Sequence, residues 1–121
     1  MKPLLAKELG SFLQRFENFQ DAELRNIEVI SPTTLKVTMA AQDSAREFDW
    51  VSIELEFNNV EDAKLLESSK LSFVDMSEGI TLIHENNRFA FGITNGYNIA
   101  NIQDAQCYIV SENVKYQESN F

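Results

Sequence analysis

Two glutamates, Glu54 and Glu56, come closest to a catalytic pair in type and spacing. On a β-strand they share one face, with about 7 Å between their Cα atoms. That separation would suit two-carboxylate hydrolysis, with one group as the acid and the other as the base or nucleophile. Exposed strands often carry the same spacing without chemistry, so we interpret the pair as surface charge.

The remaining reactive residues do not form a known catalytic, phosphate-binding or metal-binding motif. His84 is the only histidine and precedes a turn, and the four glycines form neither a phosphate loop nor a dinucleotide fingerprint. Asp43, Glu61 and Asp62 could hold a hard cation, but the spacing of a calcium-binding loop is absent. The sequence therefore predicts no enzyme activity, no cofactor and no metal site.

Cys107 is the only cysteine, which excludes an internal disulfide. Tyr108, Ile109 and Val110 follow it in a run typical of a buried strand. We therefore interpret the thiol as a small buried hydrophobic group rather than as a nucleophile.

The charge of the chain is strongly acidic. The chain contains ten basic and nineteen acidic residues, which gives a formal net charge of −9. Such a surface repels nucleic acid and anionic membranes. The acids are concentrated between residues 43 and 67, where eight acids accompany two bases. This segment is either ordinary solvated surface or a docking patch for a basic partner.

The segment 48–57 is the longest strand-like run in the chain and predicts a central antiparallel strand. From Val51 onward its apolar and polar residues alternate, as in a strand with one face on a core and one in water. Val51, Ile53, Leu55 and Phe57 form the apolar set.

Phe48 and Trp50 break this alternation, because they fall in phase with the glutamates. A β-bulge near Asp49 and Trp50 would shift both aromatic residues onto the core face, and we favour that interpretation. The alternative leaves both on the polar face, with the indole beside Glu54 as a binding platform.

Around this strand the periodicity predicts an α+β fold, in which an N-terminal amphipathic helix packs on a curved, mainly antiparallel, meander-like sheet of six or seven strands. The helix begins at Pro3 and runs to Phe16, and 121 residues predict a single domain, 1–121. Residues 60–67 fit a helix or an extended connection equally well, and 117–121 are expected to be loose. The other expected strands are 24–30, 35–41, 71–76, 80–85, 88–93 and 106–111.

The strands 80–85 and 106–111 carry apolar residues on both faces. A sheet covered on one side does not need this. We therefore expect the sheet to curl towards a barrel, or its second face to meet another copy of the chain. No signal peptide or membrane-spanning run is visible, so a cytoplasmic protein is expected.

Two segments resemble small bacterial families that include immunity proteins of polymorphic-toxin systems. Phe19-Gln20-Asp21-Ala22-Glu23-Leu24 is similar to a Phe-His-Asp-Ala entry, and residues 53–60 are similar to a later Leu-x-Phe-x-x-Val strand end. Gln20 stands where those families have histidine, so no role of that histidine is transferred. The resemblance implies a small cytoplasmic protein that neutralises a toxin.

Our leading hypothesis is a non-enzymatic, acidic, protein-binding domain of this immunity type, acting on a basic toxin domain. Its predicted contact residues are Trp50, Glu54, Glu56, Glu61 and Asp62. One alternative is a small-ligand-binding or weakly hydrolytic domain lined by Phe89, Phe91, Tyr97 and Tyr108. Another is a homo-oligomeric structural protein, such as a homodimer, that uses its second apolar face.

Overall fold

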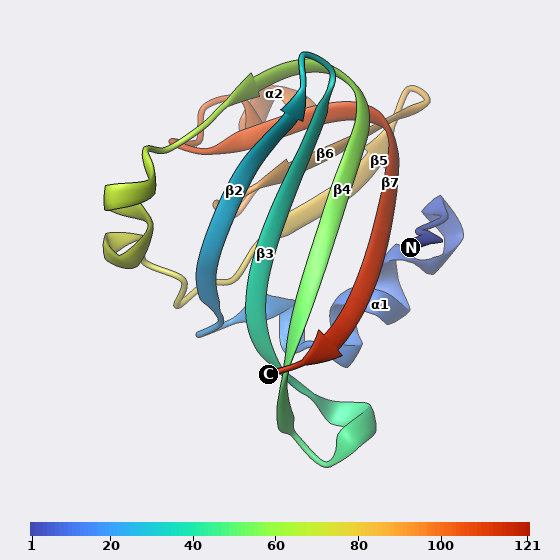
Figure 1. Cartoon of the computed structure of the whole chain (residues 1–121). Coiled ribbons are helices and arrows are strands. Elements are labelled where there is room, and N and C mark those ends of the chain that lie inside the picture. Colours follow the sequence, from blue (N-terminus) through green and yellow to red (C-terminus); the bar gives the residue numbers. More distant parts are fainter.

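The computed structural model describes residues 1–121 and shows a short N-terminal helix packed on a seven-stranded antiparallel sheet (Figure 1). The predicted α+β class is thereby confirmed. The sheet has the order β2-β3-β4-β7-β6-β5 with β1 beside β7, and it does not close into a barrel. Its elements are β1 (Lys2–Pro3), α1 (Leu9–Arg15), β2 (Glu23–Ser31), β3 (Thr34–Asp43), β4 (Asp49–Lys64), β5 (Thr81–Glu85), β6 (Arg88–Gly92), α2 (Ile99–Ile102) and β7 (Tyr108–Asn120).

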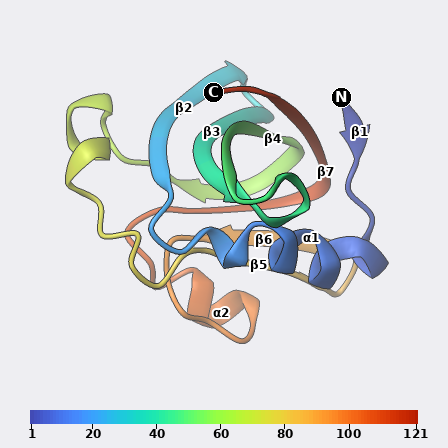
Figure 2. The same cartoon turned by 90° about the horizontal axis from the view of Figure 1, so that it is seen from below.

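The long strands β4 and β7 bend the sheet into two layers. In Figure 1 both arch over the top of the molecule, so that the front layer is β2, β3, the first part of β4 and the last part of β7. The rear layer contains β5, β6 and the other ends of β4 and β7. Figure 2 shows α1 running across the lower end between the layers, with α2 on the outer side of β5 and β6.

The alternation in β4 predicted the core correctly. Val51, Ile53, Leu55 and Phe57 are at most 2% exposed. They pack in one cluster with side chains from both layers and from the N-terminal segment, among them Leu4, Phe12, Phe16, Phe19, Val37, Met39, Phe91 and Ile109. Burial of this continuous apolar surface is the main force that holds the two layers together.

The strand continues past Asn58 and Asn59, where the sequence predicted its end. Asn59 adopts a left-handed φ of 54°, and the pairing of β4 with β7 shifts register between Val60 and Asp62. A bulge of this kind bends a strand without ending it. The undecided segment 60–67 is therefore mainly strand, because β4 runs to Lys64 and enters the rear layer.

The N-terminal helix is shorter than predicted. Pro3 lies in β1 opposite Lys115, and α1 begins only at Leu9 after a 3₁₀ turn at Ala6–Glu8. The predicted apolar stripe is confirmed at Leu4, Leu9, Phe12 and Phe16, which are buried against the sheet. No helix in the structure is both long enough and apolar enough to cross a bilayer.

Two other predictions were wrong. Residues 71–76 are not a strand, because a 3₁₀ helix occupies Ser68–Phe73. Residues 117–121 are not loose, because Gln117 to Asn120 continue β7 and pair with β4. These last residues are polar and exposed at alternate positions, so they lack the apolar periodicity that marks a strand in a sequence.

The second apolar face at β6 and β7 is covered by α2. Ala90 and Val110 pack there against Ile99 and Ile102. A Cβ atom on Gly92 would lie 2.8 Å from Ile102 Cγ2, so the absence of a side chain at Gly92 lets α2 approach β6 closely. The chain itself fills this face, which removes the reason for expecting a barrel or a second copy there.

Candidate functional site

The outward face of the front layer carries no helix, as Figure 1 shows. We call it the uncovered face. Its side chains alternate along each strand with the core residues and are exposed or half-buried, apart from the small Ala40. They are Asn26, Glu28, Lys36, Thr38, Ala40, Gln42, Trp50, Ser52, Glu54, Glu56, Lys115, Gln117 and Ser119.

Trp50 belongs to this face, so the favoured interpretation of a bulge was wrong. The pairing of β3 with β4 runs unbroken from Thr34 opposite Asn58 to Asp43 opposite Asp49. The indole therefore points to the same side as Glu54, and Trp50 is 39% exposed. The irregular backbone lies just before the strand, where Glu47 and Phe48 adopt left-handed φ values of 56° and 65°.

The exposed indole is held by neighbouring side chains. The Phe121 ring lies 5.8 Å from the Trp50 ring between centroids, and the guanidinium carbon of Arg25 lies 4.4 Å from the centre of the Phe121 ring. We call these three residues the Trp50 cluster. Aromatic packing and a cation over a ring each favour a fixed arrangement. The cluster therefore presents an ordered aromatic surface at one end of the uncovered face.

Glu54 and Glu56 share the uncovered face but differ in their surroundings. Glu56 lies between Lys36 and Lys115 in the register, in a row of alternating charge that Glu28 completes. Opposite charges on adjacent strands stabilise a sheet.

Glu54 lies between the neutral Thr38 and Gln117, and its one ion pair is with Lys36 at 3.9 Å between Nζ and Oε2. Lys36 also pairs with Glu28 at 3.9 Å. Glu54 therefore has a lysine within ion-pair distance, whereas Glu56 forms no ion pair and accepts a hydrogen bond from Asn58 Nδ2 at 3.4 Å. Both glutamates have the surroundings of surface charges.

Glu61 and Asp62 lie away from the Trp50 cluster. Glu61 lies in the bulge of β4 and Asp62 follows it, and Asp62 is twelve positions along the chain from Trp50, about 40 Å along a strand. Glu61 pairs with Arg88 at 3.2 Å, and Asp62 accepts hydrogen bonds from Gln103 Nε2 and Tyr108 Oη, both 2.9 Å long. The structure thus brings together Trp50, Glu54 and Glu56 but not the other two predicted contact residues.

Asp43 forms a buried ion cluster beside the Trp50 cluster, and sequence reasoning missed it. Its fully buried carboxylate accepts hydrogen bonds from Arg15 Nε and Nη2 at 2.9 and 2.7 Å and from the Ala45 amide at 2.9 Å. Arg15 Nη2 also contacts Glu118 at 2.5 Å, and Arg46 lies 3.7 Å from Asp43. No local pattern signals this cluster, because 103 positions separate Arg15 from Glu118.

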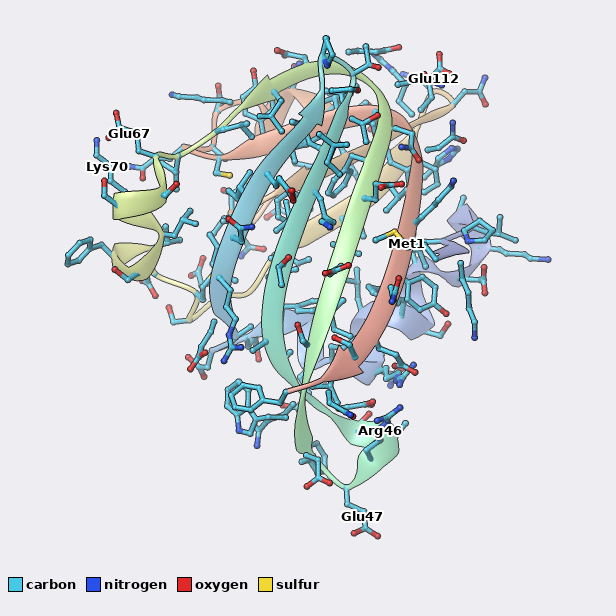
Figure 3. All side chains as sticks on the ribbon, in the orientation of Figure 1. Met1, Arg46, Glu47, Glu67, Lys70 and Glu112 are labelled. Atoms are coloured by element: carbon cyan, nitrogen blue, oxygen red, sulfur yellow. The ribbon has the colours of Figure 1, made fainter.

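The ion cluster fixes the loop between β3 and β4. Figure 3 shows Arg46 and Glu47 on this loop, which projects below the sheet. The hydrogen bonds from Arg15 hold the pKa of Asp43 below its usual value, and the Asp43 carboxylate raises the pKa of Arg15 in turn. The cluster thereby ties α1 and the end of β7 to the strand that carries Trp50.

The residues of the small-ligand hypothesis do not line one pocket. Phe89 and Phe91 are buried in the core, whereas Tyr97 is 86% exposed. Cys107 is buried, as predicted, and burial raises the pKa of its thiol to about 11. No group of three or more His, Cys, Asp or Glu side chains is placed to hold a metal ion.

Comparison of the chain with protein-family models, curated proteins and solved structures gave no match in any of the three. The resemblance of residues 19–60 to immunity-protein families therefore stays a prediction. What the protein does has to be inferred from the geometry of its own surface.

Proposed function

We propose that the uncovered face binds a basic protein, with Trp50 as the anchor of the contact. The observation that carries this proposal is an exposed indole on a sheet face that no helix covers, packed against Phe121, whose ring in turn contacts Arg25. Tryptophan and arginine are the side chains most enriched among residues that dominate binding energy.

The shape of the surface favours a macromolecular partner. The Trp50 cluster projects from one end of a broad sheet face rather than lining a cavity, and the rest of that face carries polar side chains such as Ser52, Thr38 and Gln117. Protein interfaces commonly combine aromatic side chains with polar ones at their rim. Because the indole is already ordered, binding immobilises fewer rotamers.

The charge of the chain favours a basic partner. Its net charge is −9, and Glu54 and Glu28 lie on the same face as Trp50. Opposite charge accelerates association and makes it sensitive to salt. The resemblance to immunity-protein families implies a more specific form of this function, in which the partner is a basic toxin domain and binding neutralises it. Identifying the captured partner as a toxin domain, or as another protein, tests this form.

Blocking the middle of the uncovered face is expected to abolish capture of the partner. Thr38 is half-buried on the outward side of β3, so Thr38→Cys can carry a bulky maleimide that covers the face. The buried native Cys107, whose thiol pKa is about 11, should not compete for the label. The labelled protein is used as bait in lysate of the cells that produce it, and the captured proteins are identified by mass spectrometry.

Tyr97→Cys with the same label is the matched control, because Tyr97 is highly exposed and lies outside the front layer. We expect the control and the unlabelled protein to capture the same partner, rich in Lys and Arg, and the labelled Thr38→Cys protein to lose it. Capture that survives the label on Thr38, or a captured partner that is acidic, would refute the proposal.

A further inference from the structure

The free edge of β7 contains a gap that no other strand fills. β6 pairs with β7 from Tyr108 to Ser111, and β1 pairs with it at Lys115 and Tyr116. Between these partners lies a half-open cavity of about 420 Å³. No residue of the Trp50 cluster lines it, and Lys115 is the one lining residue that was named on the uncovered face, so its occupancy can be tested separately from the protein-binding proposal.

Polar and apolar side chains meet at this cavity. His84, Lys115, Asn58 and Asn113 line it together with the apolar side chains of Leu5 and Phe89. The His84 ring packs edge-on against Phe89, with 4.7 Å between the ring centroids. A cavity of this size with an apolar wall and a few polar groups is typical of small-molecule sites.

The cavity is lined by a lysine and a histidine and by no carboxylate. Half of the ten Lys and Arg residues form ion pairs: Arg15, Arg25, Lys36, Arg46 and Arg88. Lys115 and His84 form none. Two carboxylates accept hydrogen bonds from lining residues without lining the cavity themselves. Glu8 accepts from the Leu5 amide at 3.1 Å, and Glu56, opposite Lys115 on the neighbouring strand, accepts from Asn58 Nδ2 at 3.4 Å.

We infer that this cavity binds a small organic monocarboxylate. Lys115 and His84 offer N–H donors to the carboxylate, and Leu5 and Phe89 contact its apolar body. Hydrogen bonds from charged donors to a carboxylate are stronger than those between neutral groups. A single negative charge is favoured over a phosphate dianion because the protein carries a net charge of −9.

The only histidine provides a direct reporter, because its ring gives one set of NMR signals from the side of the cavity. Hexanoate is titrated into the protein at neutral pH and constant ionic strength, with hexanol and inorganic phosphate as the comparison ligands. We expect hexanoate to shift the His84 signals saturably, with a Kd of about 1 mM. Hexanol and phosphate should each bind at least roughly tenfold more weakly. Hexanol lacks the carboxylate that Lys115 and His84 would bind, and phosphate lacks the apolar chain that Leu5 and Phe89 would contact.

Two variants test the assignment to this cavity. Lys115→Gln removes the cation and Leu5→Glu adds a repelling carboxylate, and both residues are exposed, so the fold should persist. Each should weaken hexanoate binding at least roughly fivefold, whereas the control Lys64→Gln, an exposed lysine outside the cavity, should not. The inference is overturned by unsaturable shifts, by equal binding of hexanol or phosphate, or by unchanged affinity in Lys115→Gln.

Discussion

Asp43→Ala is expected to lower the free energy of unfolding by about 3 kcal/mol, because removing one partner of a buried ion pair leaves the other charge uncompensated. The substitution deletes two hydrogen bonds from Arg15 and one from the Ala45 amide. The side chain of Arg15 is 27% exposed, so its guanidinium can regain some hydration, which places the loss at the lower end of the usual range. Thermal unfolding should show a Tm lower by roughly 10 °C.

Glu118→Ala is the matched control for this prediction. Glu118 contacts the same guanidinium, but its side chain is 31% exposed. A partly exposed ion pair contributes about 1 kcal/mol or less. Equal losses for the two variants would mean that Asp43 has no special role in the ion cluster.

The pH dependence of the same carboxylate follows from its lowered pKa. Because the folded-state pKa lies below the unfolded value of about 3.9, the stabilisation is fully present above that pH and is lost as the pH falls through the folded-state pKa. The stability difference between the wild type and Asp43→Asn should therefore be constant from neutral pH down to about 4 and shrink below it. A difference that shrinks near neutral pH would contradict this assignment.

Trp50→Ala is expected to weaken binding of the captured basic partner by about 2 kcal/mol, roughly thirtyfold in Kd. The indole is exposed and makes its main ring contact with Phe121. Its loss therefore removes contacts with the partner and leaves the packing of the hydrophobic core intact. The unfolding midpoint should consequently change little. Calorimetric titration of the purified partner measures the affinity.

Tyr97→Ala serves as the control for Trp50→Ala, because it also removes an exposed aromatic side chain but lies outside the front layer. Its Kd should equal that of the wild type. Should Trp50→Ala bind as tightly as Tyr97→Ala, the indole would not be the anchor.

The fold was predictable where one face of an element was buried. The β2–β3 hairpin, the alternating core residues of β4 and the turn at Asn86 and Asn87, with φ values of 53° and 62°, all follow from periodicity or from turn chemistry. Such patterns report whether a side chain meets apolar neighbours or water. They do not report which strand is the neighbour, so the pairing of β4 with β7 was not predictable.

The candidate site was only partly predictable, for the same reason. The phase of Trp50 was visible in the sequence, but a bulge and an exposed indole fit it equally well, and only the unbroken register opposite Gln42 decides between them. The supporting residues are distant in the chain, because Arg25 lies on β2 and Phe121 follows the end of β7. Glu61 and Asp62 were grouped with Trp50 by sequence distance, and the bend of β4 separates them.

Labelling with 5-fluorotryptophan tests the role of the uncovered face most directly, because Trp50 is the only tryptophan and gives one ¹⁹F resonance. The solvent isotope shift of this resonance between H₂O and D₂O measures the exposure of the indole. We predict a clear shift in the free protein and its loss when the basic partner binds. An indole that is shielded in the free protein, or one that stays equally exposed in the complex, would contradict the proposal that Trp50 anchors a protein partner.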